Sequence, residues 1–263
     1  MPRTINSVTN ACRLIEYLQH FEEGSVTELA EETGLTPGTV HTYLATLREE
    51  NYVMKDGSSY RLGPKLLTLG EYVRNHSDIY RAAKSQIEVL TEETGEGAHL
   101  IVEHDGQLFA LYERFGQEAV GVDYHERKRE QPLNHLHCTA AGKAILSGLS
   151  EERVREILDR RGMPEKTDHT ITDVETLLEE LDEIEERGYA FTDEEQIVGI
   201  RAVGAPIALS NGETVGAVAV SGPTARLKDE EFRESLPELV VKAANISEVN
   251  LHSIRDQSLH VPE

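Results

Sequence analysis

The chain has 263 residues, with 48 acidic against 26 basic side chains and a formal net charge of −22. This length suggests two domains. No stretch approaches about 18 apolar residues and the N-terminus lacks a signal-peptide pattern, so we expect a cytoplasmic protein without a membrane partner. The chain has 2 cysteines, and nothing in their spacing argues for a disulfide framework.

The negative charge is unevenly distributed. Residues 1–75 hold 10 acids and 7 bases, whereas the remaining residues hold 38 acids and 19 bases. An acidic surface with little lysine suits cells with high internal salt, where charge repulsion is screened over a few ångströms. A halophilic source is therefore our hypothesis, and the alternative is an ordinary acidic cytosolic protein.

Residues 25–52 have the pattern of a helix-turn-helix. Ser25 and Glu28 form a capping box at the start of the first helix, and Gly34 ends it. Thr36 can cap the second helix, which predicts that the helix begins at the next residue. Its buried stripe consists of Val40, Tyr43, Leu44 and Leu47.

A short hairpin follows, with strands 52–54 and 60–62 on either side of the turn at Asp56-Gly57. Upstream of the helix-turn-helix, a first helix is expected to pack its apolar face behind the two helices of that motif. We expect Cys12 near this apolar face. Residues 1–63 therefore predict a winged helix-turn-helix DNA-binding domain whose second helix enters the major groove. The apolar face of the earlier helix consists of Ala11, Leu14, Ile15 and Leu18.

Small polar and basic side chains lie on the predicted DNA-binding surface. Thr39, His41 and Thr42 are candidates for contacts to base edges, because they lie on the exposed face near the start of the second helix. Basic side chains at the end of that helix and on the wing are candidates for phosphate. The full predicted set is Thr36, Gly38, Thr39, His41, Thr42, Arg48, Lys55, Ser59 and Arg61.

Residues 64–77 predict a linker helix whose apolar side chains need a partner, so we expect it to pack against its copy in a homodimer. The second domain then covers residues 78–263 and begins with a helix at 79–94 that Gly95 ends. The apolar positions of the linker helix are Leu66, Leu67, Leu69, Tyr72 and Val73.

The second domain alternates strands and helices. Residues 98–115 predict a hairpin across Asp105-Gly106, and residues 116–124 predict a third strand before a polar loop at 125–134. Helices are expected after Ser150, after a capping box of Thr172 with Glu175, and from Glu230 to about Ile254. A second hairpin turns at Asn211-Gly212. Helices packed on one face of an antiparallel sheet give an α+β domain.

A run of small residues joins a loop to a helix start in this domain. Small side chains let a ligand approach the backbone, and free N–H groups at a helix N-terminus attract a carboxylate. A small organic acid is the natural guest. The predicted effector-binding residues here are His137, Cys138, Thr139, Ala140, Ala141 and Gly142.

Other chemistries are weaker alternatives. The segment Ala141-Gly142-Lys143 lacks the earlier glycine and the Ser or Thr of a phosphate loop. A soft metal at His135, His137 and Cys138, with Asp193 or His169, has suitable donors, but loop packing is the commoner explanation. The carboxylates of Glu194 and Glu195 fit a solvated turn better than an acid–base pair. We therefore expect no cofactor, no bound metal and no catalytic site.

Several segments together resemble the IclR family of transcriptional regulators, in order and over nearly the whole chain. They are GLTPGTVHTYLATLREENYV with YRLG, then LHCTAAGKAIL, HTITDVETLLEEL, RGYAFTDEEQIVGIRAVGAPI and VAVSGP. The resemblance implies a winged helix-turn-helix, a linker helix and a GAF-like α/β effector-binding domain, in dimers often paired into tetramers on palindromic operators. Thr42 stands where the family commonly has arginine, and residues 125–134 are longer than the usual link.

The resemblance also implies which positions complete the effector pocket. Ala202 and Ala219 are apolar where several family members are polar, which favours an aromatic or longer-chain acid. We therefore predict a DNA-binding regulator gated by a small organic effector; the alternative is a ligand-free or metal-sensing regulator whose second domain mainly oligomerises. The implied positions are Thr192, Asp193, Ile200, Ala202, Ala219 and Ser221.

Overall fold

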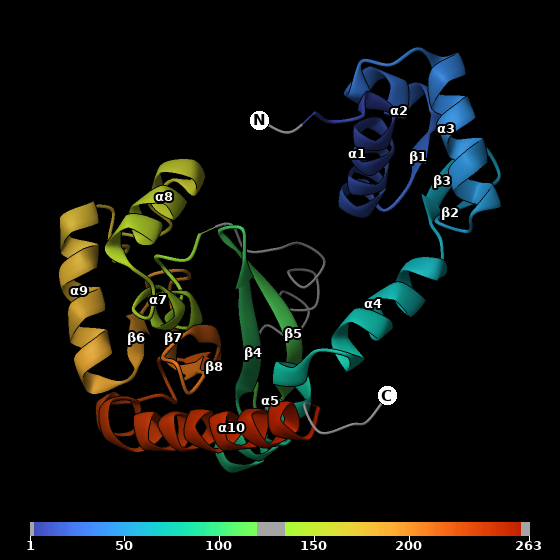
Figure 1. The fold of residues 1–263 in the computed structure, drawn as a ribbon. Coiled ribbons are helices and arrows are strands. Elements are labelled where there is room, and N and C mark those ends of the chain that lie inside the picture. The colour runs from blue at the N-terminus through green and yellow to red at the C-terminus, as the bar shows by residue number, and fades with distance from the viewer. Residues whose placement is uncertain (1–2, 120–134, 259–263) are drawn as a thin grey trace. The chain divides into compact units, whose positions relative to one another are not determined.

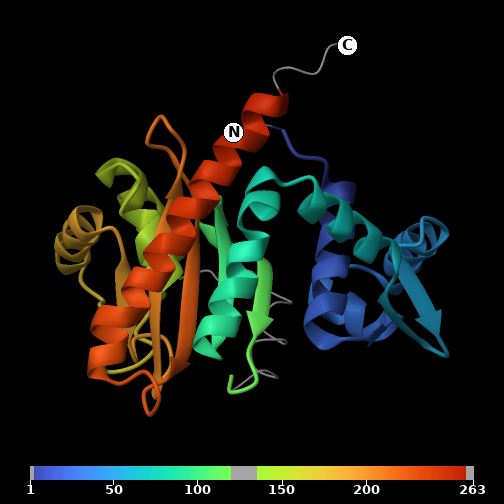
Figure 2. The same cartoon turned by 90° about the horizontal axis from the view of Figure 1, so that it is seen from below.

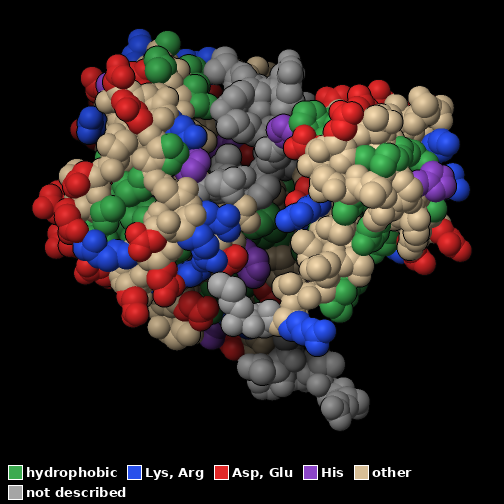
Figure 3. Space-filling view, turned by 90° about the horizontal axis from the view of Figure 1, so that it is seen from above, with side chains coloured by type: hydrophobic (Ala, Val, Ile, Leu, Met, Phe, Trp, Pro, Cys, Tyr) green, Lys and Arg blue, Asp and Glu red, His purple; other side chains and the backbone are tan. Residues whose placement is uncertain are grey.

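The computed structural model describes residues 3–119 and 135–258, and the chain divides into two compact units between Arg74 and Asn75 (Figure 1). Within the described ranges, no helix combines the length and the apolar character that crossing a membrane requires. Acidic side chains are scattered over the face drawn in Figure 3 rather than gathered in one patch.

The N-terminal unit is a small helical domain with a three-stranded sheet in the order β1-β3-β2. The side chains of Leu14, Leu29 and Leu44, one from each of the first three helices, have no exposed surface and form its core. Its elements are α1 (Asn6–Phe21), β1 (Gly24–Ser25), α2 (Val26–Thr33), α3 (Pro37–Glu49), β2 (Val53–Asp56), β3 (Ser59–Leu62) and α4 (Lys65–Asn75).

Both predicted helix starts in this unit are confirmed. The Ser25 hydroxyl accepts from the Glu28 N–H at 3.3 Å, and the Glu28 carboxylate accepts from the Ser25 N–H at 2.8 Å. The Thr36 hydroxyl caps α3 by accepting from the Thr39 N–H at 3.2 Å. The expectation for Cys12 is wrong, because its side chain is exposed.

The C-terminal unit contains a fully antiparallel five-stranded sheet in the order β5-β4-β8-β7-β6. Its strands are β4 (Gly97–His104), β5 (Gln107–Phe115), β6 (Ala190–Asp193), β7 (Ile200–Ala208) and β8 (Thr214–Pro223). Its helices are α5 (Asp78–Thr94), α7 (Ala140–Leu146), α8 (Glu151–Arg161), α9 (Val174–Arg187) and α10 (Leu236–Ser258), the last preceded by a π-helical turn at Glu231–Ser235.

Helices cover both faces of this sheet, so the prediction of one covered face is wrong. On one face α5 and α10 lie side by side (Figure 2) and bury Val203 and Val220. On the other face α7, α8 and α9 bury Ala217 and Ala219. Because β8 carries buried apolar side chains on both of its sides, each side needs its own cover against water.

Two local predictions in this unit also change. The N-cap of α9 is Asp173, not Thr172: the Asp173 carboxylate accepts from the Thr176 N–H at 2.9 Å. The strand β5 ends at Phe115 and residues 116–119 include a turn; the rest of the predicted third strand and the loop at 125–134 lie outside the described residues.

Candidate functional site

The outer face of α3 carries the predicted base-contacting side chains. His41 and Thr42 are exposed, whereas Thr39 is partly buried. The Thr42 hydroxyl donates to the Gly38 carbonyl at 3.0 Å, and the Thr36 and Thr39 hydroxyls are 2.9 Å apart. His41 is therefore the most freely presented of these polar groups.

An apolar groove of about 620 Å³ runs between α1 and α3 within the N-terminal unit. Thr39 and Thr42 of α3 are among its lining residues, whereas the neighbouring His41 is not. The residues that line it are Ser7, Val8, Ala11, Thr39, Thr42, Tyr43, Thr46 and Leu47.

The basic side chains of this unit lie where the sequence predicted them. Arg48 is exposed in the last turn of α3. Lys55 on β2 lies with its Nζ 5.6 Å from the centre of the Tyr60 ring. Arg61 on β3 forms an exposed ion pair with Asp56 of β2 at 3.6 Å. Ser59 is partly buried on the same strand.

In the C-terminal unit, the register of four strands aligns several of the predicted effector residues. Thr192, Ala202 and Ser221 pair across β6, β7 and β8, and Gly97 of β4 pairs with Ser221. The neighbouring row, Ala190, Gly204, Ala219 and His99, is displaced by two residues along each strand, so both rows point to one face. We call it the α7 face.

The helix α7 packs on this face backbone to backbone. A Cβ added at Gly204 would lie 2.7 Å from the carbonyl carbon of Ala140, so only glycine permits this approach. All seven residues of α7 are buried. We expected free N–H groups at this helix start. The Gly142 N–H instead donates to the Thr139 hydroxyl at 3.0 Å. The start of α7 is therefore capped by the chain itself.

Asp193 does not join the α7 face. Its neighbour in register is Arg201, and the guanidinium binds both carboxylate oxygens at 2.7 and 3.0 Å. This carboxylate faces away from Thr192, because successive residues of a strand point to opposite sides. Ile200 of β7 pairs with Pro223 of β8. It lies two residues from Ala202, so it is on the α7 face, where it is partly buried.

His137 and Cys138 are buried, which decides their chemistry. Burial lowers the pKa of His137 to about 4, so its imidazole is neutral, and Nε2 is 3.3 Å from the Pro164 carbonyl oxygen. Burial, with Glu195 nearby, raises the pKa of the Cys138 thiol to about 11. A neutral thiol is a poor nucleophile and a poor metal ligand. Among residues 3–119 and 135–258, no group of three or more His, Cys, Asp or Glu side chains has metal-binding geometry.

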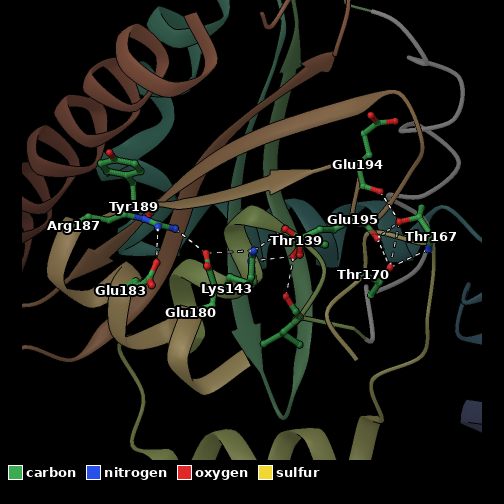
Figure 4. Close-up of polar contacts among 12 residues, drawn as sticks. Thr139, Lys143, Thr167, Thr170, Glu180, Glu183, Arg187, Tyr189, Glu194 and Glu195 are labelled. Carbon is green, nitrogen blue, oxygen red and sulfur yellow. Dashed lines mark hydrogen bonds and ion pairs between the residues drawn. The ribbon is translucent and has the colours of Figure 1, made fainter. Parts of the chain in front are cut away.

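The prediction that Glu195 lies in a solvated turn is wrong, because this residue is only 8% exposed. Its Oε1 is 2.8 Å from the Nζ of Lys143 on α7, and the same Nζ is 3.7 Å from Glu180 on α9 (Figure 4). Arg187 extends the network by donating to Glu180 at 2.8 Å. Burial raises the pKa of the Glu195 carboxyl, and the Lys143 ammonium opposes that effect.

A second buried polar group, which was not predicted from the sequence, lies on the α7 face. His99 of β4 lies with Nδ1 at 2.6 Å from Glu113 Oε1 and with Nε2 at 2.9 Å from Ser221 Oγ. The available signal was a histidine within the otherwise apolar segment 98–102, since a polar side chain there must find partners when buried.

A winged helix-turn-helix followed by a separate α+β unit is the architecture expected of a DNA-binding transcriptional regulator. The chain matches the "IclR helix-turn-helix domain" over residues 7–57 and the "Bacterial transcriptional regulator IclR C-terminal" domain over residues 71–248. It therefore belongs to the IclR family.

Individual relatives agree with this assignment. The probable HTH-type transcriptional regulator ArcR of Halobacterium salinarum is 40% identical over 253 residues, 96% of each chain. The IclR structure from Thermotoga maritima has a TM-score of 0.74 at 28% identity, over 94% of this chain and 99% of its own. An IclR homologue from Microbacterium hydrocarbonoxydans, complexed with 4-hydroxybenzoate, has the same fold, with a TM-score of 0.80 at 19% identity over 94% and 99% of the chains.

Proposed function

We propose that this IclR-family regulator binds a palindromic operator as a homodimer in the cytoplasm, and that a small organic acid bound on the α7 face changes its operator affinity. The observation that carries the effector proposal is the convergence of Thr192, Ala202 and Ser221 from the three strands β6, β7 and β8 on one face of the sheet. The resemblance to the family also favours the pairing of two such dimers into a tetramer.

The chemistry of the α7 face supports an aromatic or longer-chain acid. Ala202, Ala219 and Gly97 have small side chains or none and add no polar group, while Thr192 and Ser221 supply hydroxyls that can donate to a carboxylate. The likeness in fold to a homologue that was solved with 4-hydroxybenzoate makes this acid a natural first probe.

For DNA, we propose that Thr39, His41 and Thr42 contact base edges and that Arg48, Lys55 and Arg61 contact phosphate. Thr36, Gly38 and Ser59 complete the proposed DNA-contacting set. Dimerisation through α4 would hold two copies of α3 on half-sites separated by about one or more helical turns. Because coupling between sites is reciprocal, DNA would change effector affinity by the factor by which the effector changes DNA affinity.

The DNA proposal is tested by selecting operators from a random duplex pool and measuring affinities by fluorescence anisotropy over a KCl series. His41→Ala should bring the affinities of selected and scrambled duplexes closer together. Arg48→Ala should weaken binding to both duplexes about equally and reduce the salt slope by about one. Lys228→Ala, an exposed lysine of the other unit, is the control for loss of a positive charge. Unchanged operator affinity in both test variants would contradict the proposed DNA-contacting face.

The effector proposal is tested by a thermal-shift screen of organic acids at high KCl, with 4-hydroxybenzoate, benzoate and pyruvate among them. A saturable shift that is lost in Ser221→Ala supports the α7 face. A screen without any shift, together with normal operator binding, would favour the regulator whose second domain only oligomerises.

A further inference from the structure

The imidazole of His99 has a hydrogen-bonding partner at each nitrogen and almost no contact with solvent. His99 is 7% exposed, and the Glu113 side chain beside it is 8% exposed. Gly97 lets the strand pack closely against two rings, since a Cβ there would lie 3.1 Å from the Phe115 ring and 3.3 Å from His99 Nε2. Nε2 and the Ser221 hydroxyl thus lie on the α7 face beside the glycine that pairs with Ser221.

The proton positions in this chain follow from the partners. The Glu113 carboxylate can only accept, so Nδ1 of His99 carries a proton and donates to it. In the neutral imidazole Nε2 then has no proton, and the Ser221 hydroxyl must donate its single proton to Nε2. The Ser221 hydroxyl therefore has nothing left to donate to a ligand while His99 is neutral.

A carboxylate that binds at Ser221 reverses the second hydrogen bond. The Ser221 hydroxyl donates to the carboxylate, so its oxygen can only accept from the His99 side, and Nε2 must acquire a proton. That proton also limits repulsion, because without it the ligand and Glu113 would place two negative charges in one poorly solvated site. One N–H bond forms, and the proton comes from the buffer.

We propose that His99 takes up one proton when a carboxylate effector binds, and that it thereby selects the acid over the corresponding neutral amide. This inference rests on the proposed effector role of the α7 face. Glu113 Oε1, 2.6 Å from Nδ1, faces the imidazolium that this proton creates.

The other charged groups on the packed elements are already engaged. The only charged residue of α7, Lys143, pairs with Glu195, and the nearby His137 faces the Pro164 carbonyl. Across the sheet, β5 contributes Glu113 and β8 contributes the Ser221 hydroxyl, with the Phe115 ring 5.8 Å from the His99 ring. Among the described residues of these elements, His99 is therefore the group placed to take the proton.

The test is calorimetric titration of the full chain with 4-hydroxybenzoate, benzoate, pyruvate and 4-hydroxybenzamide at about pH 8, in buffers of different ionisation enthalpy. The slope of the binding heat against that enthalpy counts the protons. We expect about one proton taken up per site for each acid that binds, none for the amide, and an affinity for acids that falls about tenfold per pH unit in the alkaline range.

Two histidines of β4 provide a matched pair of variants. His99→Gln should abolish proton uptake and weaken acid binding about tenfold or more, while His104→Gln, at the exposed end of the same strand, should leave both unchanged. Acid binding by the wild type without proton uptake overturns this inference alone, even if His99→Gln fails to fold. If none of the acids binds at all, the proposed effector function fails, and this inference fails with it.

Discussion

Lys143 and Glu195 form an ion pair in the interior of the C-terminal unit, with 2.8 Å between Nζ and Oε1 and side chains only 2% and 10% exposed. They are separated by 52 residues and join α7 to the segment after β6. The Glu195 carbonyl oxygen also accepts from the Thr170 hydroxyl at 2.7 Å, so this segment is held from two sides.

Removing one partner of this pair should destabilise the protein strongly. Lys143→Met leaves the Glu195 carboxylate buried without its counter-charge, and we expect a loss of about 3 to 5 kcal/mol in the free energy of unfolding. Urea denaturation at neutral pH measures it, with Lys166→Met, an exposed lysine, as the control. The double variant Lys143→Met, Glu195→Leu should recover much of the loss. A loss below about 1 kcal/mol for Lys143→Met would contradict a buried pair.

The low pKa of His137 should make stability depend on pH. Above pH 6.5 its imidazole is neutral in both the folded and the unfolded chain; below it, the unfolded chain binds a proton that the folded chain excludes down to about pH 4. The free energy of unfolding therefore falls by up to about 3 kcal/mol as pH decreases through this window. His137→Gln keeps a donor and cannot titrate, so it should lose less stability than the wild type between about pH 7.5 and 4.5. Parallel pH profiles for the two proteins would rule out this assignment.

The start of α9 allows a comparison of two adjacent residues. Asp173→Ala removes the side chain that accepts from the Thr176 N–H, and we expect it to cost about 1 kcal/mol in chemical denaturation. Thr172→Ala removes no cap and should change stability by less than about 0.5 kcal/mol. The reverse order of effects would restore Thr172 as the cap.

The exposed apolar side chains of α4 test the proposed dimer. Leu69 and Val73 are 40% and 65% exposed and lie one turn apart on the helix. Leu69→Glu and Val73→Glu should each raise the dimer dissociation constant at least about tenfold in sedimentation velocity, because a carboxylate would be buried at the contact. Thr68→Glu, exposed on the same helix, is the matched control. Equal dissociation constants for all three variants would place the dimer contact elsewhere.

Local signals were sufficient where the partners of a residue lie close in sequence. The capping box at Ser25 and the cap at Thr36 each need a partner three residues away, and both are present. The strand β1 was missed because its two residues pair with β3, about 35 positions later, and its composition gives no strand signal. Glu195 was misjudged for the same reason: only Lys143, far away in sequence, makes its burial possible.

The pairing of His99 with Glu113 could not be deduced from the hairpin turn. A regular hairpin that pairs His104 with Gln107 would place Tyr112 opposite His99. The irregularity between Leu100 and Ile101 shifts the register by one residue and brings Glu113 there instead. The α7 face was predicted in part, through Thr192, Ala219 and Ser221, whereas its charged chemistry depends on this bulge.

The absence of a side chain at Gly204 fixes the spacing between two layers of the protein. Elsewhere in the interior, side chains separate a helix from the sheet and can change rotamer to absorb a small displacement. Between Ala140 and Gly204 there is only backbone, so no such adjustment is available. A ligand that displaces the start of α7 toward the sheet must therefore displace β7 with it, because this backbone contact cannot be compressed.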